Sequence, residues 1–431
     1  MKISPSQIWQ MVENQGKGEL FCDIYGVTKV NQNPLMRIVE LIDKIEDGPL
    51  MLYSAPGRTE LGGNHTDHNN GKVLCAAVRQ DTLAAVRPNQ SDEVIVYSEG
   101  FKSPFRVGVN NLNIQTNEKG STTSLIRGVL AGIKRRGGKV SGFEAWITST
   151  VGIGSGLSSS ASFEVLIGTI VSHYYNKGSL SAEEIAQIGQ FSENEYFGKP
   201  CGLMDQSASA LGGILEIDFK NPDSIITQKL NFDIDMSEYQ LVIVNVGSDH
   251  TDLTPEYAAI PAEMKSIARE YGVDVLRQLT IDDILTNLSK LKQEYGDRAL
   301  LRTIHFFNEN NRVESMTDAL KNSDFNRYLH IVESSGISSQ TLLQNTIPSV
   351  SNGVEQSMAL ALGVSRHFFE ERNRGVARVH GGGFAGTIQA YIHKDDFADY
   401  SDLIRSIFGK NTIENLVFRN SGACHLLNIT E

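Results

Sequence analysis

Residues Gly152-Ile-Gly-Ser-Gly-Leu-Ser-Ser-Ser-Ala-Ser162 form the stretch that decides the fold of this chain. Apolar residues from Phe143 to Thr150 predict a strand before it, and apolar spacing predicts a helix over 160–174 after it. Glycines between a strand and a helix let successive backbone N–H groups turn toward one point, where the helix N-terminus adds partial positive charge. The stretch therefore predicts a loop that holds phosphate without a basic patch.

Two other glycine-rich segments lie far from this loop in the chain. They are Ala55-Pro-Gly-Arg-Thr-Glu-Leu-Gly-Gly-Asn-His-Thr-Asp-His68 and His380-Gly-Gly-Gly-Phe-Ala-Gly386. A fourth, shorter segment is Cys201-Gly-Leu-Met-Asp-Gln206. Its aspartate stands among small and apolar residues, where a carboxylate is poorly solvated and needs a counter-charge. Core packing alone would not require this pattern.

The composition is that of a globular protein. Of 431 residues, 40% are hydrophobic and 21% are charged, and this length favours about two or three domains. The formal net charge of −12 disfavours nonspecific binding to nucleic acid or to an anionic membrane. The four cysteines include no Cys-x-x-Cys pair, which predicts a reduced, cytoplasmic chain. We see neither a signal peptide nor an apolar run of the about 18–20 residues that a membrane helix needs.

Together and in this order, the four segments resemble the galactokinase branch of the GHMP small-molecule kinases. The resemblance runs from about residue 55 to residue 391. It implies an α+β protein with the two-domain GHMP kinase fold. A ribosomal-protein-S5-like N-terminal domain and a ferredoxin-like C-terminal domain would enclose the active site in the cleft between them. We place these domains at residues 1–238 and 239–431, because the next clear strand begins near Leu241.

The resemblance implies an ATP-dependent kinase that transfers the γ-phosphoryl group of MgATP to the anomeric hydroxyl of a hexose, first of all galactose. ATP and Mg²⁺ would then be required, and we expect a cytoplasmic monomer or weak homodimer with no nucleic-acid or membrane partner. A kinase for galacturonate or another modified hexose, or a non-catalytic galactokinase-like sugar sensor, remains an alternative. A mevalonate or homoserine kinase would fit the loops but would leave His65, Asp67 and Tyr257 unexplained.

Arg58 and Asp205 are the catalytic residues that the resemblance implies. Asp205 would accept or orient the proton of the attacking sugar hydroxyl. Arg58 would keep Asp205 ionised and soften the charge on the transferring phosphoryl group. For the metal, the resemblance implies Glu193, with Glu195 as a competitor and Ser159 as a second ligand.

The phosphate loop would bind ATP through its backbone amides and serine hydroxyls. We assign this role to Gly152, Gly154, Ser155, Gly156, Leu157, Ser158, Ser159 and Ser160. The chain contains no Gly-x-x-x-x-Gly-Lys-Ser/Thr motif, so a P-loop site is excluded. The segment at 380–386 is also similar to the oxyanion segment of some esterases, but the chain has no Gly-x-Ser-x-Gly elbow and we reject a hydrolase.

The resemblance assigns sugar recognition to five residues, which are Asn64, His65, Asp67, Gly202 and Tyr257. Asp67 would bind two ring hydroxyls and His65 a more distal one, while Gly202 would offer its backbone amide. His65 and His68 also form a His-x-x-His pair, but no clear third ligand accompanies them, so we disfavour zinc.

Two positions of the sugar signature depart from the family pattern. Asn64 stands where the family has glutamate, and His68 stands where it has tyrosine. In the family this glutamate faces the C6 hydroxyl of the sugar. An asparagine would tolerate a C6 carboxylate that a glutamate repels. The change at residue 64 therefore reflects either drift within a galactokinase or a preference for a uronic acid.

Overall fold

The computed structural model of the chain describes residues 3–46, 48–152, 154–199, 201–221, 225–230, 238–247, 253–349, 353, 355–384 and 386–429. Its strands are β1 Leu50–Gly62, β2 Lys72–Pro88, β3 Glu93–Ser98, β4 Phe105–Gly108, β5 Phe143–Ser149, β6 Ile214–Asp218, β7 Ile226–Leu230, β8 Tyr239–Asn245, β9 Val376–Val379, β10 Thr387–His393, β11 Ile413–Leu416 and β12 Cys424–Ile429. Its helices are α1 Pro5–Asn14, α2 Gly18–Tyr25, α3 Met36–Ile42, α4 Thr122–Arg135, α5 Ser159–Asn176, α6 Ala182–Phe191, α7 Met204–Leu211, α8 Thr254–Glu270, α9 Ile281–Thr286, α10 Leu288–Lys321, α11 Phe325–Ser338, α12 Ser357–Arg372 and α13 Phe397–Phe408.

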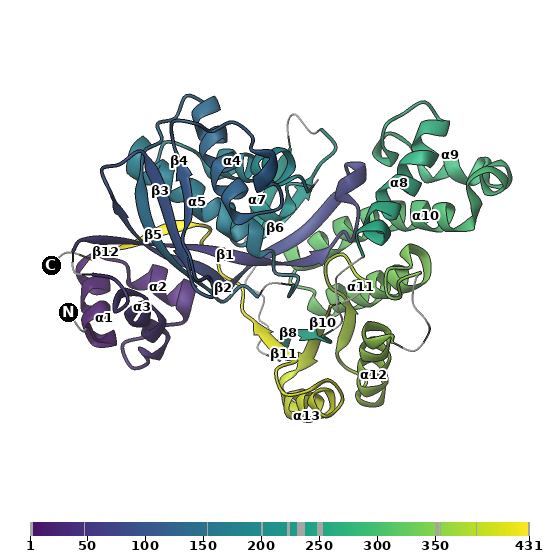
Figure 1. The fold of residues 1–431 in the computed structure, drawn as a ribbon. Coiled ribbons are helices and arrows are strands. Elements are labelled where there is room, and N and C mark those ends of the chain that lie inside the picture. Colours follow the sequence, from purple (N-terminus) through teal and green to yellow (C-terminus); the bar gives the residue numbers. More distant parts are fainter. Residues whose placement is uncertain are drawn as a thin grey trace.

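The strands form two sheets, which lie apart in Figure 1. The larger sheet has the order β12-β1-β2-β5-β3-β4, and β6 and β7 extend it from β2. The smaller sheet has the order β11-β8-β10-β9. The register of β1 against β2 shifts between Pro56 and Arg58 and again between Glu60 and Gly62. Such bulges re-aim side chains, and here they flank two charged residues of the sugar signature.

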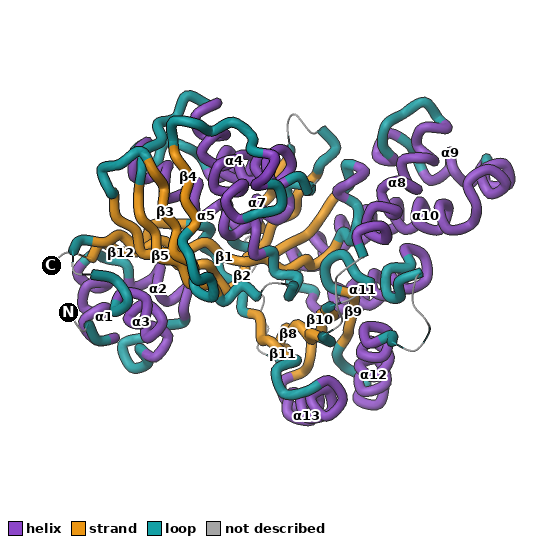
Figure 2. The backbone as a smooth tube through the Cα atoms, viewed as in Figure 1, coloured by secondary structure: helices purple, strands orange, loops and turns teal. Residues whose placement is uncertain are grey.

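The larger sheet is covered on both faces, as the tube in Figure 2 shows. Helices α4 and α5 pack on one face through residues such as Ile126 and Leu166. Helices α1 to α3 pack on the other through Ile8 and Phe21, which join Leu83 of β2 in one cluster. The segment before β1, whose role the sequence leaves open, therefore covers a sheet face that would otherwise expose apolar side chains to water.

The smaller sheet carries α12 and α13 on one face. Its first strand, β8, begins at Tyr239, where we divide the chain. The last strand, β12, nevertheless pairs with β1 in the larger sheet, with Ile429 opposite Leu50. The division between residues 238 and 239 stays a proposal, with the qualification that the C-terminal strand returns to the first sheet.

Several predicted elements are confirmed with small shifts of their ends. The strand before the phosphate loop is β5, and the helix after it is α5. The long helix α10 has non-helical backbone at Gly296 (φ 78°). None of the helices in the described residues combines the length and the apolar character that crossing a bilayer requires.

Candidate active site

The loop between β5 and α5 is open at its mouth. Gly152 and Gly154 are exposed, whereas Leu157 is buried. The hydroxyl of Ser155 donates to the carbonyl oxygen of Gly152 at 2.7 Å and so folds the loop back on itself. Ile153 lies outside the described residues.

Helix α5 begins directly behind this loop. Ser158, its N-cap, has left-handed backbone (φ 62°) and within the described residues gives the helix no side-chain cap. The first N–H groups of an α-helix have no partner inside the helix. Gly156 also has positive φ (75°), and a Cβ there would lie 2.7 Å from Nδ1 of His380. The N-terminus of this 18-residue helix therefore offers donors and positive dipole to an anion.

Arg58 and Asp205 form an ion pair beside the loop. Nε of Arg58 donates to Oδ1 of Asp205 at 2.6 Å, and its Nη1 donates to the carbonyl oxygen of Gly156. Arg58 follows the first bulge of β1, and Asp205 lies in the first turn of α7. The side chain of Arg58 is 8% exposed and that of Asp205 is 30% exposed. The pair thus joins strand, loop and helix while one edge of the carboxylate stays open.

The second oxygen of Asp205 is also bound. The hydroxyl of Ser158 donates to Oδ2, although the sequence assigned this serine to ATP. Burial raises the pKa of Asp205, but the charge and hydrogen bonds of Arg58 and Ser158 outweigh it and leave this pKa below its ordinary value. Asp205 is therefore an ionised hydrogen-bond acceptor at neutral pH.

Glu193, the acid expected to hold the metal, lies in a π-helical turn, Ser192–Phe197, directly after α6. Its side chain is buried, and the hydroxyl of Ser160 donates to its Oε1 at 3.1 Å. Among the described contacts it is Ser160, and not the expected Ser159, that meets Glu193. Carboxylate and hydroxyl oxygens are ligands that Mg²⁺ prefers. π-helical turns often occur at functional sites, where they change the direction of a side chain.

Sequence reasoning missed three side chains around Glu193. Nζ of Lys199, which is 64% exposed, lies 3.3 Å from Oε1 of Glu193. Nε2 of Gln206 donates to Oε2 of Glu193 at 2.9 Å and to Oε2 of Glu164 at 3.1 Å. Lys199 and Gln206 flank or belong to the Cys201–Gln206 motif and could have been inferred from it. Glu164 sits in an apolar helix pattern and gave no signal.

Asp67 and Gly202, both assigned to the sugar, lie against each other. A Cβ on Gly202 would lie 2.3 Å from Oδ2 of Asp67, so a side chain at residue 202 would displace this carboxylate. The other oxygen, Oδ1, accepts the N–H of His68 at 2.9 Å. Because Gly202 lies two residues before the start of α7, this contact places the carboxylate of Asp67 close to the helix that carries Asp205.

His65 and Tyr257 both contact the third glycine-rich segment. Nε2 of His65 lies 2.9 Å from the carbonyl oxygen of Gly382, and the hydroxyl of Tyr257 donates to the carbonyl oxygen of Gly383 at 2.9 Å. A carbonyl only accepts, so Nε2 of His65 carries the hydrogen. Burial and the nearby His68 lower the pKa of His65, so its ring is neutral. Its buried Nδ1, without a partner among the described residues, can then accept a hydroxyl hydrogen.

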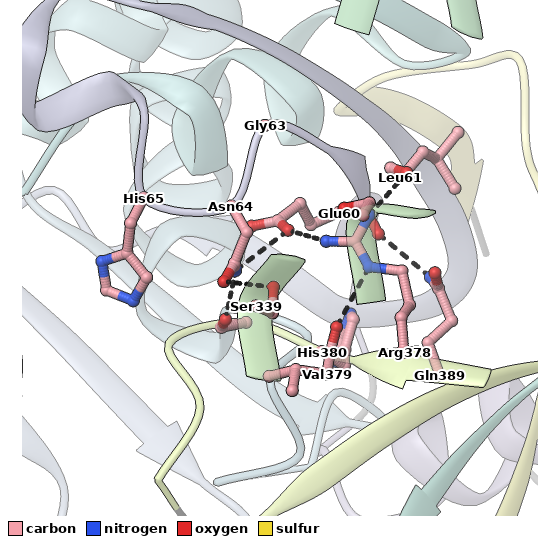
Figure 3. Close-up of polar contacts among 12 residues, drawn as sticks. Glu60, Leu61, Gly63, Asn64, His65, Ser339, Arg378, Val379, His380 and Gln389 are labelled. Carbon is pink, nitrogen blue, oxygen red and sulfur yellow. Dashed lines mark hydrogen bonds and ion pairs between the residues drawn. The ribbon is translucent and has the colours of Figure 1, made fainter. Parts of the chain in front are cut away.

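Asn64 differs from the other predicted sugar residues. Its side chain is almost completely buried and points toward Glu60 and Ser339 in Figure 3, whereas the ring of His65 lies apart from that group. Its polar atoms contact protein partners, which include Glu60 and Gly381. The structure therefore brings Arg58, Asp205 and the phosphate loop together, and Asp67 with Gly202, but it engages Asn64 elsewhere.

Two family models match parts of this chain. The GHMP kinases N terminal domain matches residues 124–213, and the galactokinase galactose-binding signature matches residues 43–88. Among solved structures, a Lactococcus lactis galactokinase complexed with galactose is similar, with TM-score 0.74, 22% identity and coverage of 96% of this chain and 100% of that chain.

Two more distant structures share the fold. A Methanococcus jannaschii mevalonate kinase has TM-score 0.61 and 18% identity over 87% of this chain and 100% of that chain. A Streptococcus pneumoniae phosphomevalonate kinase in complex with phosphomevalonate and AMPPNP has TM-score 0.58 and 13% identity over 87% of this chain and 99% of that chain. The expected GHMP kinase fold is confirmed. The chain therefore carries the N-terminal domain of the GHMP kinases and the galactose-binding signature of the galactokinases.

Proposed function

We propose that this protein is an ATP-dependent sugar kinase that phosphorylates the anomeric hydroxyl of a hexose, with galactose as the first candidate. One observation carries the proposal. An ionised Asp205, held by Arg58 and Ser158, lies at the N-terminus of α5 and close to the contact between Asp67 and Gly202. An acceptor for a hydroxyl proton therefore lies between a phosphate-binding helix end and a carboxylate suited to sugar hydroxyls.

In this proposal Asp205 receives the proton of the sugar hydroxyl while the hydroxyl oxygen bonds to the γ-phosphorus. The bond from that phosphorus to the bridging oxygen breaks, and ADP leaves with the electron pair. Arg58 keeps Asp205 ionised and lies where it can offset charge on the phosphoryl group. The backbone N–H groups at the start of α5 hold the phosphates in line with the sugar.

Glu193 and Ser160 are the residues that fit the magnesium of MgATP. They present a carboxylate and a hydroxyl to one point, and Lys199 already places a cation there. Magnesium, when bound, neutralises charge on the phosphates. Because Lys199 is mostly exposed, its ammonium group can leave Glu193 without an interior rearrangement.

Sugar recognition in the proposal rests on acceptors and one amide. Asp67 accepts two hydroxyls, Nδ1 of neutral His65 accepts another, and Gly202 donates its N–H. The match to the galactose-binding signature supports galactose as the sugar.

The test is ATP-dependent phosphorylation of galactose, glucose, galacturonate, N-acetylgalactosamine, mevalonate and homoserine. Wild type should phosphorylate galactose, and Asp205→Asn should lower kcat by about 10²- to 10⁴-fold. Asp297→Asn, an aspartate that is 71% exposed on α10, is the matched control and should keep wild-type activity. Turnover of galacturonate alone would transfer the proposal to a uronic acid. Sugar binding without turnover of any compound would contradict a kinase.

A further inference from the structure

The glycine turn 381–383 is held by three side chains of the sugar signature and its surroundings. Its three successive carbonyl oxygens accept from Asn64, His65 and Tyr257 at distances of 2.7, 2.9 and 2.9 Å. Two of these side chains, His65 and Tyr257, are among the predicted sugar contacts. The position of the turn therefore decides where both of them stand.

Asn64 has no polar hydrogen left for a substrate. Its Nδ2 donates to the carbonyl oxygen of Gly381 at 2.7 Å and to Oε1 of Glu60 at 3.1 Å, which uses both amide hydrogens. Its Oδ1 accepts from Nδ2 of Asn345 at 2.8 Å. The side chain is 1% exposed. The strong contacts of this amide are thus made inside the protein, and Figure 3 shows how its side chain lies against Glu60 and Ser339.

Glu60 explains why residue 64 is an amide. The carboxylate of Glu60 is sealed from water and paired with Arg378, whose other nitrogens donate to the carbonyl oxygens of Leu61 at 2.8 Å and Val379 at 3.1 Å. Burial raises the pKa of Glu60 to about 7 despite this arginine. A second carboxylate at residue 64 would face Glu60 and the Gly381 carbonyl, which are both acceptors. The amide instead supplies the donors that this interior lacks.

The turn itself has little freedom to compensate for a lost contact. A Cβ on Gly382 would lie 2.5 Å from the ring of Tyr257, and one on Gly383 would lie 2.3 Å from the carbonyl oxygen of Asn345. Nδ2 of Asn345 also reaches the carbonyl oxygen of Gly382 at 3.2 Å. Asn64 and Asn345 therefore hold one tightly packed turn from two sides.

We propose that Asn64 is a positioning residue, which sets sugar affinity by fixing the glycine turn beneath His65 and Tyr257 and does not touch the sugar. This inference rests on the proposed sugar-kinase function. It replaces the expectation that Asn64 contacts the sugar with a role through Gly381 and Asn345. The change from the family's glutamate is then an adaptation to Glu60.

The first test compares wild type and Asn64→Ala on galactose and its 2-, 3-, 4- and 6-deoxy analogues. We expect KM for each sugar to rise by a similar factor, about tenfold to a hundredfold, because misplaced binding groups weaken several contacts together. KM for MgATP should change by less than about twofold. A penalty that vanishes on one deoxy analogue would show a direct contact to that hydroxyl and overturn the proposal.

The second test needs no substrate and so separates this inference from the proposed function. In Asn64→Ala, backbone hydrogen exchange should be faster than in wild type in the peptide that spans residues 376–392. If Asn64→Ala does not fold, Asn345→Ala is the second variant, and the same peptide should exchange faster in it. Asn69→Ala is the matched control, because Asn69 is equally buried but bonds to the N–H of Leu276. Unchanged exchange in the peptide would overturn the proposal. If wild type phosphorylates no sugar, the proposed function fails while this measurement still decides the role of Asn64.

Discussion

Two arginine–carboxylate pairs start from strand β1, and they differ in how much water reaches them. In the pair Arg58–Asp205, the carboxylate side chain is 30% exposed and its pKa is lowered. In the pair Arg378–Glu60, the carboxylate is 4% exposed and burial raises its pKa to about 7. The same two chemical groups can therefore serve catalysis where one edge is open and serve as a structural link where both are sealed.

The largest effect is expected when the open pair, Arg58–Asp205, is broken. Asp205→Asn keeps the shape of the side chain but removes the proton acceptor, so kcat should fall by about 10²- to 10⁴-fold. Glu60→Gln, the isosteric change in the sealed pair, should lower kcat by less than about tenfold. Steady-state kinetics with MgATP and the sugar identified in the panel would check both variants. Equal losses would contradict the separation of the two roles.

The sealed pair, Arg378–Glu60, should contribute more to the free energy of unfolding than the open pair, Arg58–Asp205. Arg378→Met leaves Glu60 buried without its cation, which should lower the free energy of unfolding by about 3–5 kcal/mol. Arg58→Met should cost less than about 2 kcal/mol, because water can reach the open edge of Asp205. Urea unfolding of both variants against wild type gives the comparison directly. A larger loss of unfolding free energy in Arg58→Met than in Arg378→Met would contradict the structural role of the pair Arg378–Glu60.

Exchanging the carboxylate and the amide between residues 60 and 64 tests how the two positions interact. Asn64→Glu brings a second carboxylate toward Glu60 and should lower the free energy of unfolding by about 1–3 kcal/mol. Adding Glu60→Gln restores one carboxylate and one amide around Arg378, so part of that loss should return. A double-mutant cycle of unfolding free energies measures this coupling. Strictly additive losses would mean that the two positions do not act as a unit.

The sequence predicted the pair Arg58–Asp205 but not the pair Arg378–Glu60, because only the first stands in recognisable motifs. The strand–loop–helix around Ser158 has a local pattern, and Arg58 and Asp205 stand in recognisable motifs, so their roles could be proposed from the sequence. Glu60 and Arg378 lie 318 positions apart in the chain, and neither belongs to a pattern that signals a pair. Asn345 lies in no motif at all. Only the folded chain shows that these groups share one interior.

Smaller differences arose from local geometry. The sequence alone does not distinguish the roles of Ser158, Ser159 and Ser160. The first turn of α5 directs their hydroxyl groups differently. Ser158 meets Asp205, and Ser160 meets Glu193. The left-handed backbone at Ser158 and the π-helical turn at Glu193 fix these contacts, and neither feature follows from residue type alone.

The contact between Ser160 and Glu193 leads to a prediction for magnesium binding. Ser160→Ala should weaken the apparent affinity for Mg²⁺ at fixed ATP by about tenfold, which corresponds to about 1.4 kcal/mol. Ser159→Ala is the neighbouring control, and its effect should be less than about twofold. Titration of activity with Mg²⁺, supported by Mn²⁺ binding measured by electron paramagnetic resonance, would check both. A larger effect at Ser159 would restore the ligand first inferred from the sequence.

The last prediction concerns the opposite response of the two carboxylates to pH. Glu60 has a raised pKa of about 7 in the folded protein against an ordinary 4.5, so the folded state holds its proton more tightly over that interval. Its contribution to stability is complete below pH 4.5 and is lost as pH rises toward 7, at a rate of at most about 1.4 kcal/mol per pH unit.

Asp205 has a lowered pKa, so its contribution is present above its ordinary value of 3.8 and is lost only as pH falls below it. Urea unfolding between about pH 5 and about pH 7 should therefore show a falling contribution in wild type that disappears in Glu60→Gln and persists in Asp205→Asn. Because Asp205 is ionised in both states over this interval, its own titration contributes nothing to this slope. A slope lost in Asp205→Asn instead would mean that the open pair, and not the sealed one, carries the raised pKa.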